Sequence, residues 1–334
     1  MKKMLAIALC LMMMLCCLPA LAEDAAATPV TVSLVVADAL GDMGFYDSAN
    51  DGLEKLKADY GVNGKVVECK NDAGKWQPLL VEAAQSSDIV VCVGWEFWDA
   101  LTEVVPQMPE TKFVFVDNGL DGLGDNLVSI VYSENQGSFL VGYAAMKLSP
   151  NAKVGFVGGE DSDTINNFFI GYQAGALAAN AEGTVSAPLY TDSYDDASRG
   201  KECADKLFSD GCDVIFQAAD KAGLGVFESA KNNGKYAIGV DKDQKHVNPD
   251  VVICSMVKEV GLSIYDVVAQ YVTDGTFAGG TIVEADLAGG YVGIAYGADD
   301  MTQQISDELK AEIEALKQQI VDGTIVVPSS YDAE

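Results

Sequence analysis

The strongest constraint on the fold of this chain is a regular alternation of short Val- and Ile-rich runs with amphipathic segments. The first runs lie at 30–36, 65–69, 88–93, 112–117 and 127–132, and apolar residues recur at helical spacing in 48–60, 77–85 and 95–105. Strands that alternate with helices form parallel sheets. The first part of the chain therefore predicts one Rossmann-like lobe, completed by a helix from Glu134.

The same alternation starts again after the break at Ser149-Pro150-Asn151. It predicts strands at 153–157, 184–190, 213–217, 236–240 and 251–255, and helices at 165–179, 197–210 and 223–232. The helix after Lys258, to about 274, is expected to return to the first lobe. A Gly-rich strand at 289–297 and a helix at 301–320 then close the second lobe.

The predicted fold class is therefore α/β, with two Rossmann-like lobes joined by a hinge of several crossings. We expect residues 28–148 and about 257–286 in the N-terminal lobe, and residues 149–256 and about 287–330 in the C-terminal lobe. Such a hinge lets two lobes close over a ligand. The pattern does not fix the strand order.

The N-terminus has the three sections of a secretory signal: Lys2 and Lys3, an apolar stretch over 4–18, and small residues before Glu23. We expect a signal peptide over 1–22, cleaved after Ala22, and hence an extracytoplasmic protein. Cys16 and Cys17 lack the small residue that normally precedes a lipidated cysteine. We therefore favour a freely secreted or periplasmic protein over a lipid-anchored one.

Charge and cysteine content narrow the classes of partner. Loss of Lys2 and Lys3 with the signal takes the formal net charge from −29 to −31, which argues against nucleic acid and anionic lipid as partners. The five remaining cysteines lack CxxC spacing and predict free thiols that pack as small hydrophobes. They are Cys69, Cys92, Cys203, Cys212 and Cys254. The sequence offers no credible zinc ligand set.

Polar residues stand where predicted strands end, which is where ligands bind in open α/β sheets. Asp117 ends the fourth run, and Asp241 follows the run at 236–240. Lys258 lies shortly after the run at 251–255. An Asp after a buried strand is also a common loop or capping residue, and Asp241 with Lys258 could form a structural ion pair across the hinge. Both interpretations stay open at this point.

Four motifs occur in one order along the chain: Gly41 to Ala49, Phe113 to Asp117, Val154 to Gly159, and Gly239 to Gln244 followed by Ser255 to Lys258. In this combination the chain resembles the basic membrane protein family of nucleoside-binding lipoproteins, which serve ABC importers. The resemblance covers nearly all of the chain after the signal. It implies a type I periplasmic-binding-protein fold, a nucleoside ligand, most often a purine, and an ABC permease as partner. It implies a monomer without a cofactor.

The resemblance also implies a role for each of three base-binding residues. Phe45 and Phe168 correspond to the rings that stack on the two faces of the base, where each adds about 1 kcal/mol of stacking. Asp117 corresponds to the carboxylate that accepts from the base edge. Phe45 could alternatively pack in the core, and Phe169 and Tyr172 compete with Phe168 by their helical spacing.

At the sugar end, the resemblance implies that Asp241 accepts from vicinal hydroxyls and that Lys258 donates to hydroxyl or ring oxygens. Gly223 belongs to a loop whose backbone approaches the sugar. Asp220 and Lys221 depart from the Gly-rich pattern of that loop. They could cap the following helix, or they could alter the ribose end of the site.

Other candidate binding residues are Asp42, Tyr46 and Trp95. Tyr46 replaces the Asn that usually follows the stacking Phe, so recognition of the base edge is expected to differ. Asp42 could accept from the ligand, whereas we expect Asp47 to cap a helix that begins near it. Trp95 fits the cavity rim and the lobe core equally well, and His246 is expected on a surface loop.

An enzyme is the rival class of function, but the chain has no nucleophile elbow, metal cluster, Walker loop or histidine–acid pairing. We therefore expect no catalysis. A receptor for another small molecule, such as a sugar, a vitamin or a signalling compound, stays an alternative. Tyr46 and Asp220 keep this alternative open because both alter the expected nucleoside site.

Overall fold

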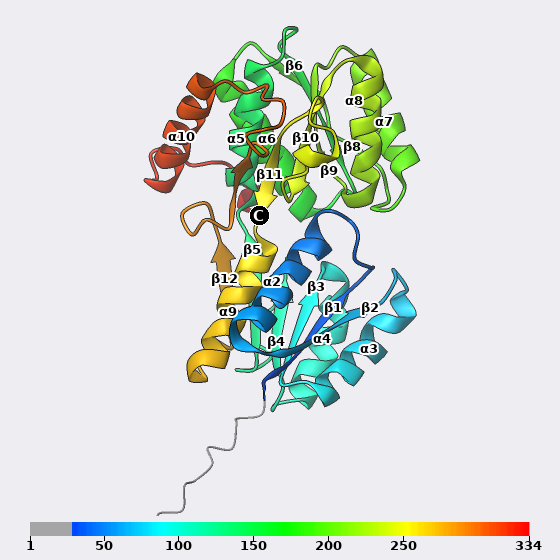
Figure 1. The fold of residues 1–334 in the computed structure, drawn as a ribbon, viewed down its shortest axis with the longest axis vertical. Coiled ribbons are helices and arrows are strands. Elements are labelled where there is room, and N and C mark those ends of the chain that lie inside the picture. Colours follow the sequence, from blue (N-terminus) through cyan, green and yellow to red (C-terminus); the bar gives the residue numbers. More distant parts are fainter. Residues whose placement is uncertain (1–28, 334) are drawn as a thin grey trace, which may run out of the picture.

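The computed structural model describes residues 29–333 as two sheets of mostly parallel strands, each flanked by helices and set one above the other (Figure 1). The expected signal peptide over 1–22 lies outside the described residues. Among the described residues, no helix is both long and apolar enough to cross a membrane. The predicted fold class, with two parallel α/β lobes, is confirmed.

The first sheet has the strand order β12-β5-β4-β3-β1-β2, and all of its neighbours are parallel. Its strands are β1 (Thr31–Val36), β2 (Asn63–Glu68), β3 (Ile89–Val93), β4 (Lys112–Val116), β5 (Leu127–Tyr132) and β12 (Thr281–Ala285). The helices of this lobe are α2 (Phe45–Tyr60), α3 (Ala73–Ser86), α4 (Trp98–Val104) and α9 (Val260–Asp274), with short 3-10 turns η2 (Trp95–Phe97) and η3 (Val105–Gln107).

The second sheet has the order β13-β11-β10-β9-β6-β7, with β8 also paired to β6. Its strands are β6 (Lys153–Gly158), β7 (Thr184–Val185), β8 (Leu189–Tyr190), β9 (Val214–Ala218), β10 (Tyr236–Asp241), β11 (Val252–Lys258) and β13 (Val292–Ala295). Its helices are α5 (Glu134–Lys147), α6 (Asp163–Ala179), α7 (Ala197–Ser209), α8 (Gly223–Asn233) and α10 (Asp307–Val321), with 3-10 turns η4 (Asp220–Ala222), η5 (Lys245–Val247) and η6 (Ser330–Ala333).

Several element boundaries differ from the sequence predictions for identifiable reasons. The single strand expected at 184–190 is two short strands, because Pro188 between them has no N–H to donate to a ladder. The edge strand β12 was not predicted, and β13 runs antiparallel to β11. Helix α10 begins only at Asp307, where the Ser306 side chain accepts from Leu309 N.

Three chain crossings join the lobes, after β5, after β11 and after β12. Helix α5, which we expected in the first lobe, packs instead against α6 and the second sheet. Glycines let these two helices approach, since a Cβ on Gly175 would lie 1.9 Å from Phe139 O. Helix α9 packs on α2 of the first lobe through the close approach of Gly52 and Gly261.

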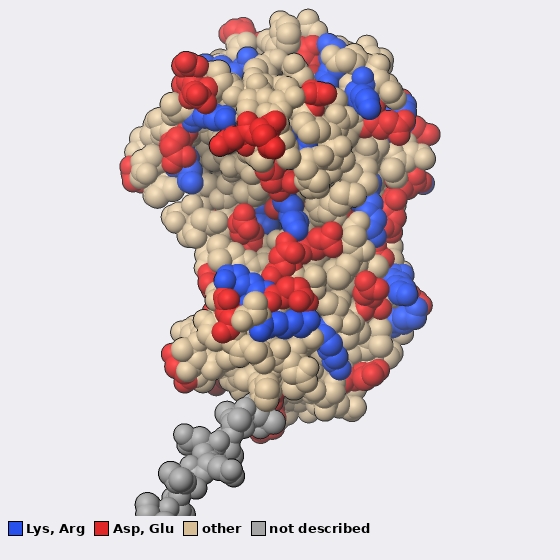
Figure 2. All heavy atoms as spheres, in the orientation of Figure 1, with Lys and Arg blue, Asp and Glu red and all other residues tan. Residues whose placement is uncertain are grey.

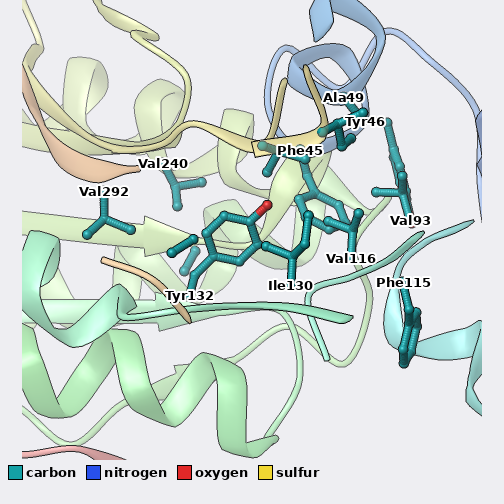
Figure 3. Packing of buried hydrophobic residues seen from close by; sticks show 14 of the residues in the cluster. Phe45, Tyr46, Ala49, Val93, Phe115, Val116, Ile130, Tyr132, Val240 and Val292 are labelled. Atoms are coloured by element: carbon teal, nitrogen blue, oxygen red, sulfur yellow. The ribbon is translucent and has the colours of Figure 1, made fainter. Parts of the chain in front are cut away.

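Both sheets have the same order of connections. The chain goes from the first strand to the neighbouring edge strand, and the later strands then add on the other side of the first strand. The reversal lies between β1 and β3 in one lobe and between β6 and β9 in the other. In open α/β sheets, ligands bind outside the carboxyl ends of the strands at such a reversal. Figure 3 shows Phe45 of α2 pointing toward Val116 and Ile130, close to these strand ends in the first lobe.

Candidate functional site

A cavity of about 1040 Å³ lies between the lobes, lined by residues that follow the carboxyl ends of strands in both sheets. Eight of the nine predicted site residues line it, namely Asp42, Phe45, Tyr46, Trp95, Asp117, Phe168, Asp241 and Lys258. Gly223 does not. It starts α8 at a close contact with β9, where a Cβ would lie 1.9 Å from Gln217 Oε1.

The Lys258 ammonium sits among three aromatic rings. Its Nζ lies 5.2 Å from the ring centroid of Phe45, 5.4 Å from that of Phe168 and 4.7 Å from that of Tyr132. Phe45 comes from the first turn of α2, and Phe168 comes from α6 in the other lobe. Rings from two lobes therefore face one central point of the cavity, and a cation there gains from the ring quadrupoles.

The neighbouring aromatic residues of α6 have other roles. Tyr172 is fully buried and packs against Phe156 and Phe216. Phe169 packs against Phe156 at a centroid distance of 5.5 Å and does not line the cavity. Of the three aromatic residues that competed in the sequence, only Phe168 lines the cavity.

Lys258 is an ion-pair partner of Asp117 and of Glu134, the latter at 3.2 Å. The alternative structural pair expected from the sequence, Lys258 with Asp241, is absent from the ion pairs of the described residues. Burial alone would lower the pKa of the Lys258 ammonium, but Asp117, Glu134 and Asp241 outweigh burial and raise it. Burial raises the pKa of both the Asp117 and the Glu134 carboxyl group, and Lys258 opposes that rise.

Glu134 was not singled out as a site residue from the sequence. It is 1 % exposed, lies at the first chain crossing and accepts from Asn167 Nδ2 at 2.8 Å. The sequence feature that could have indicated Glu134 is its position, two residues after Tyr132 at the carboxyl end of β5. An acidic residue in the first turn of a helix is so common that this signal has little weight.

Asp42 caps the first turn of α2, a role that we had expected of Asp47. The Asp42 carboxylate accepts from the backbone N–H groups of Gly44, Tyr46 and Asp47 at 2.7–3.1 Å. Asp47 instead accepts from Gly41 N and Met43 N in the preceding loop. Burial raises the pKa of Asp42, and these three N–H groups counteract that rise.

Three cavity carboxylates stand on residues with left-handed backbone. Asp117 has φ +77°, Asp220 φ +46° and Asp241 φ +63°. Residues other than glycine rarely adopt this conformation, Asp and Asn less rarely than others, and strained backbone of this kind recurs at functional sites. Asp220, which differs from the Gly-rich loop that the resemblance implies, lines the cavity. It lies next to the end of the adjacent strand β10, where Asp241 is located.

The rim of the cavity carries Trp95 and Glu96, which follow β3. Trp95 is 50 % exposed, whereas Phe97, two residues later, is fully buried in the lobe core. Burial raises the pKa of Glu96 to about 7, and its Oε2 has no hydrogen-bond partner. Tyr46 is buried against Phe45, with ring centroids 5.3 Å apart.

The C-terminal segment forms part of the cavity wall through Val326, Val327, Ser329 and Tyr331. Asn135 holds this segment by donating to Val327 O and Pro328 O, both at 3.1 Å. Because these contacts join residues about 190 positions apart in the sequence, local sequence patterns gave no indication of them.

The two lobes also touch at the rim through polar side chains. Lys221 Nζ lies 2.8 Å from Asp38 Oδ2, and Lys242 Nζ lies 2.5 Å from Asp51 Oδ2. Gln244 Nε2 donates to Met43 O at 3.1 Å. Acidic side chains gather over both lobes and at the waist between them on the face shown in Figure 2.

Among the described residues, no group of three or more His, Cys, Asp or Glu side chains is placed to hold a metal ion. His246 is exposed on η5, as predicted, with Nδ1 2.9 Å from Asp243 O. Four of the five cysteines in the described part of the chain are buried, and Cys203 is half-buried.

Comparison with known proteins places these features in a family. A model described as "ABC transporter substrate-binding protein PnrA-like" matches residues 29–331. Basic membrane protein A2 of Borrelia garinii subsp. bavariensis is 33 % identical over 306 residues, covering 90 % of this chain and 89 % of the relative. The CD4+ T-cell-stimulating antigen of Listeria innocua is 34 % identical over 330 residues, covering 92 % and 90 %.

Solved structures agree with the fold. A solute-binding protein of an ABC transporter system from Aeropyrum pernix K1 has a TM-score of 0.79 at 26 % identity, covering 90 % of this chain and 94 % of that one. A Caulobacter myo-inositol binding protein bound to myo-inositol has a TM-score of 0.60 at 17 % identity, covering 76 % and 91 %. The second likeness concerns the fold alone.

Proposed function

The chain belongs to the Bmp family of PnrA-like ABC transporter substrate-binding proteins, and from this premise we propose that it captures a purine nucleoside in the cavity between its lobes. Members of this family are solute receptors, so the chain is a non-enzymatic binding protein of an ABC transporter system. The identity of the solute is the part that we propose.

One observation carries the proposal: rings from two different lobes, Phe45 and Phe168, have their centroids 5.2 and 5.4 Å from the same cavity atom, Lys258 Nζ. A flat base between them would gain stacking on both faces, about 1–3 kcal/mol for each base stacked on an aromatic ring. Asp117, at the end of β4, lies at the same point through its contact with Lys258. A carboxylate there can accept from the N–H groups of a purine edge.

Asp241 and Lys258 are proposed to bind the sugar. Asp241 lines the cavity, and no group among the described residues donates a hydrogen bond to its carboxylate, so its oxygens are available to hydroxyl groups. Lys258 has three N–H donors, of which Asp117 and Glu134 engage two. The remaining donor is available to a hydroxyl or ring oxygen of the ligand.

The cellular setting is also a proposal. We propose that the chain acts outside the cytoplasm, as a monomer that presents its closed form to an ABC permease. Residues 28–148 with about 257–286, and 149–256 with about 287–330, are the lobes proposed from the sequence. The packing of α5 on α6 supports a first boundary at Ser133 rather than after residue 148.

Calorimetric titration tests the ligand. The purified chain, unfolded and refolded to remove any carried solute, is titrated with adenosine, guanosine, inosine, cytidine, uridine, ribose and free bases. We expect dissociation constants of about 1 μM or lower for purine nucleosides. We expect Asp117→Asn to abolish this binding, while Asp125→Asn, an exposed loop substitution outside the cavity, leaves it unchanged.

The aromatic contacts are tested separately with Phe168→Ala and a matched control on the same helix, Phe169→Ala. Phe168→Ala should weaken purine nucleoside binding by at least tenfold, whereas Phe169→Ala should leave it unchanged because its ring lies outside the cavity. Tight binding of a sugar, with no loss in Phe168→Ala, would instead identify a sugar receptor and refute the proposal.

A further inference from the structure

The carboxylates of the cavity differ in what they face. Asp42 accepts from three backbone N–H groups, and Asp117 and Glu134 face Lys258. Asp220 and Asp241 have neither a hydrogen-bond nor an ion-pair partner for their side chains among the described residues. Asp241 is nevertheless only 7 % exposed, and it lines the cavity.

These two carboxylates meet at one place. Asp220 follows β9, and Asp241 is the last residue of the adjacent strand β10, at the same edge of the second sheet. The position that a Cβ on Gly44 would take lies 3.5 Å from Asp241 Oδ2 and 3.8 Å from Asp220 Oδ1. Gln244 Nε2 lies 3.7 Å from that position, but it already donates to Met43 O.

The basic side chains of the cavity do not neutralise this pair, because Lys258 lowers the pKa of both carboxyl groups by less than burial raises it. Two lysines and no arginine line the cavity within the described part of the chain. Lys221 is paired with Asp38 and Asp195 at the rim. Lys258 already faces two other carboxylates. Asp220 and Asp241 therefore carry negative charge that the two lysines of the cavity do not balance.

Two carboxylates in one buried space cannot both be ionised unless a cation joins them. Burial accordingly raises the pKa of Asp241 to about 7 and that of Asp220 well above its usual value. A proton can satisfy the pair, and so can a cationic group of the ligand. A phosphate group would instead add negative charge to the same space.

We propose that Asp220 and Asp241 select a ligand whose sugar carries a protonated amine and reject ligands whose sugar is phosphorylated. This inference rests on the proposed function, because Asp241 marks the sugar end of the site only if the ligand is a nucleoside. Asp220 is the proposed determinant that departs from the Gly-rich loop implied by the family resemblance. An ammonium group between the two carboxylates would replace the proton that they share when no amine is bound.

The test compares adenosine with three derivatives: one with an amine in place of the 5′-hydroxyl, one with an amine in place of the 3′-hydroxyl, and the 5′-monophosphate. Asp220→Gly is the informative variant, because glycine adopts the left-handed backbone of this position without strain. Asp192→Gly is the matched control, because Asp192 also has positive φ but is exposed and lies outside the cavity.

We expect one of the amines to bind the wild-type chain at least tenfold more tightly than adenosine, and the monophosphate to bind at least a hundredfold more weakly. Asp220→Gly should reduce the advantage of the amine to less than threefold, and Asp192→Gly should retain it. Titration in buffers of different ionisation enthalpy should show proton release with the amine and none with adenosine.

Two failures can be told apart. If adenosine binds but neither amine gains affinity, or if Asp220→Gly keeps the full gain, the amine selection is wrong while the nucleoside receptor stands. If no nucleoside or derivative binds the folded chain, the proposed function is wrong and the amine selection fails with it.

Discussion

Replacement of Lys258 by methionine tests the buried ion-pair network most directly. The side chains of Lys258 and Glu134 are each 2 % exposed, and that of Asp117 is 16 % exposed. Methionine has a similar length and keeps contact with the surrounding rings, but it leaves two buried carboxylates without a cation. Removal of one partner from a buried pair costs about 3–5 kcal/mol. We expect a loss of this size in the free energy of unfolding near neutral pH.

The assay is urea unfolding followed by circular dichroism and tryptophan fluorescence together. Lys245→Met is the matched control, because Lys245 is fully buried but donates to the neutral acceptors Val252 O, Ile253 O and Gln304 Oε1. Its removal leaves carbonyl groups unpaired, which costs about 1–3 kcal/mol, but it leaves no charge without a partner. The control should therefore lose less stability and show little dependence on pH.

The pH dependence has a defined sign. Without Lys258, the carboxyl groups of Asp117 and Glu134 have folded-state pKa values raised further above their unfolded values. A carboxyl group whose pKa is higher in the folded than in the unfolded chain stabilises the folded chain at pH values below its unfolded-state pKa. This stabilisation is lost as pH rises through the folded-state pKa. The deficit of Lys258→Met should thus shrink as pH is lowered from about 8 to about 5.

Adding Glu134→Gln to Lys258→Met should restore about 1–3 kcal/mol, because one of the unpaired charges is then gone. The reasoning is refuted if Lys258→Met lies within about 1 kcal/mol of the wild-type chain at neutral pH. It is refuted equally if the effects of the two substitutions simply add.

Three further predictions concern stability and closure. Burial raises the folded-state pKa of Asp241 and of Glu96 to about 7, above their unfolded values. Thermal melts should therefore show that stability rises as pH falls from about 8 to about 5.5, by at most about 1.4 kcal/mol per pH unit for each group. Asp241→Asn should make this dependence on pH less steep. Gly175→Val should cost at least about 3 kcal/mol in urea unfolding, because its side chain would meet Phe139 O across the α5–α6 contact. Lys242→Ala, at an exposed interlobe pair, should change the unfolding free energy by less than about 1 kcal/mol, and a larger loss would mean that the rim contacts stabilise the closed arrangement.

The strands were predictable because buried parallel strands appear in the sequence as continuous apolar runs. Ile89–Val93 is such a run, and all five of its residues are buried. The same property located Asp117 and Asp241, since each is the first polar side chain after a buried strand. Local sequence and the rule that ligands bind at carboxyl ends of strands made these positions candidates, and the family resemblance assigned their binding roles.

Contacts between distant segments were not predictable in this way. The pairing of Lys258 with Glu134 joins two chain crossings, and neither residue indicates the other by local pattern. Asp42 rather than Asp47 caps α2 because of where this helix begins. Gly44 allows the helix to begin at Phe45. The partly exposed edge strand β12 lacks the apolar run that marks the central strands.

Closure of the lobes must draw most of its free energy from the ligand. The rim pairs Lys221–Asp38 and Lys242–Asp51 are partly exposed, and such pairs contribute about 0–1 kcal/mol each. A shift from mostly open to mostly closed needs about 5.5 kcal/mol of differential binding. If the ligand is the proposed nucleoside, contacts that form only between the closed lobes would supply it, namely a base held between Phe45 and Phe168 and hydrogen bonds to Asp117. A ligand that stacked on one ring alone would then bind without closing the receptor, so the pair of rings, rather than either one, would determine the closed form that we propose is presented to the permease.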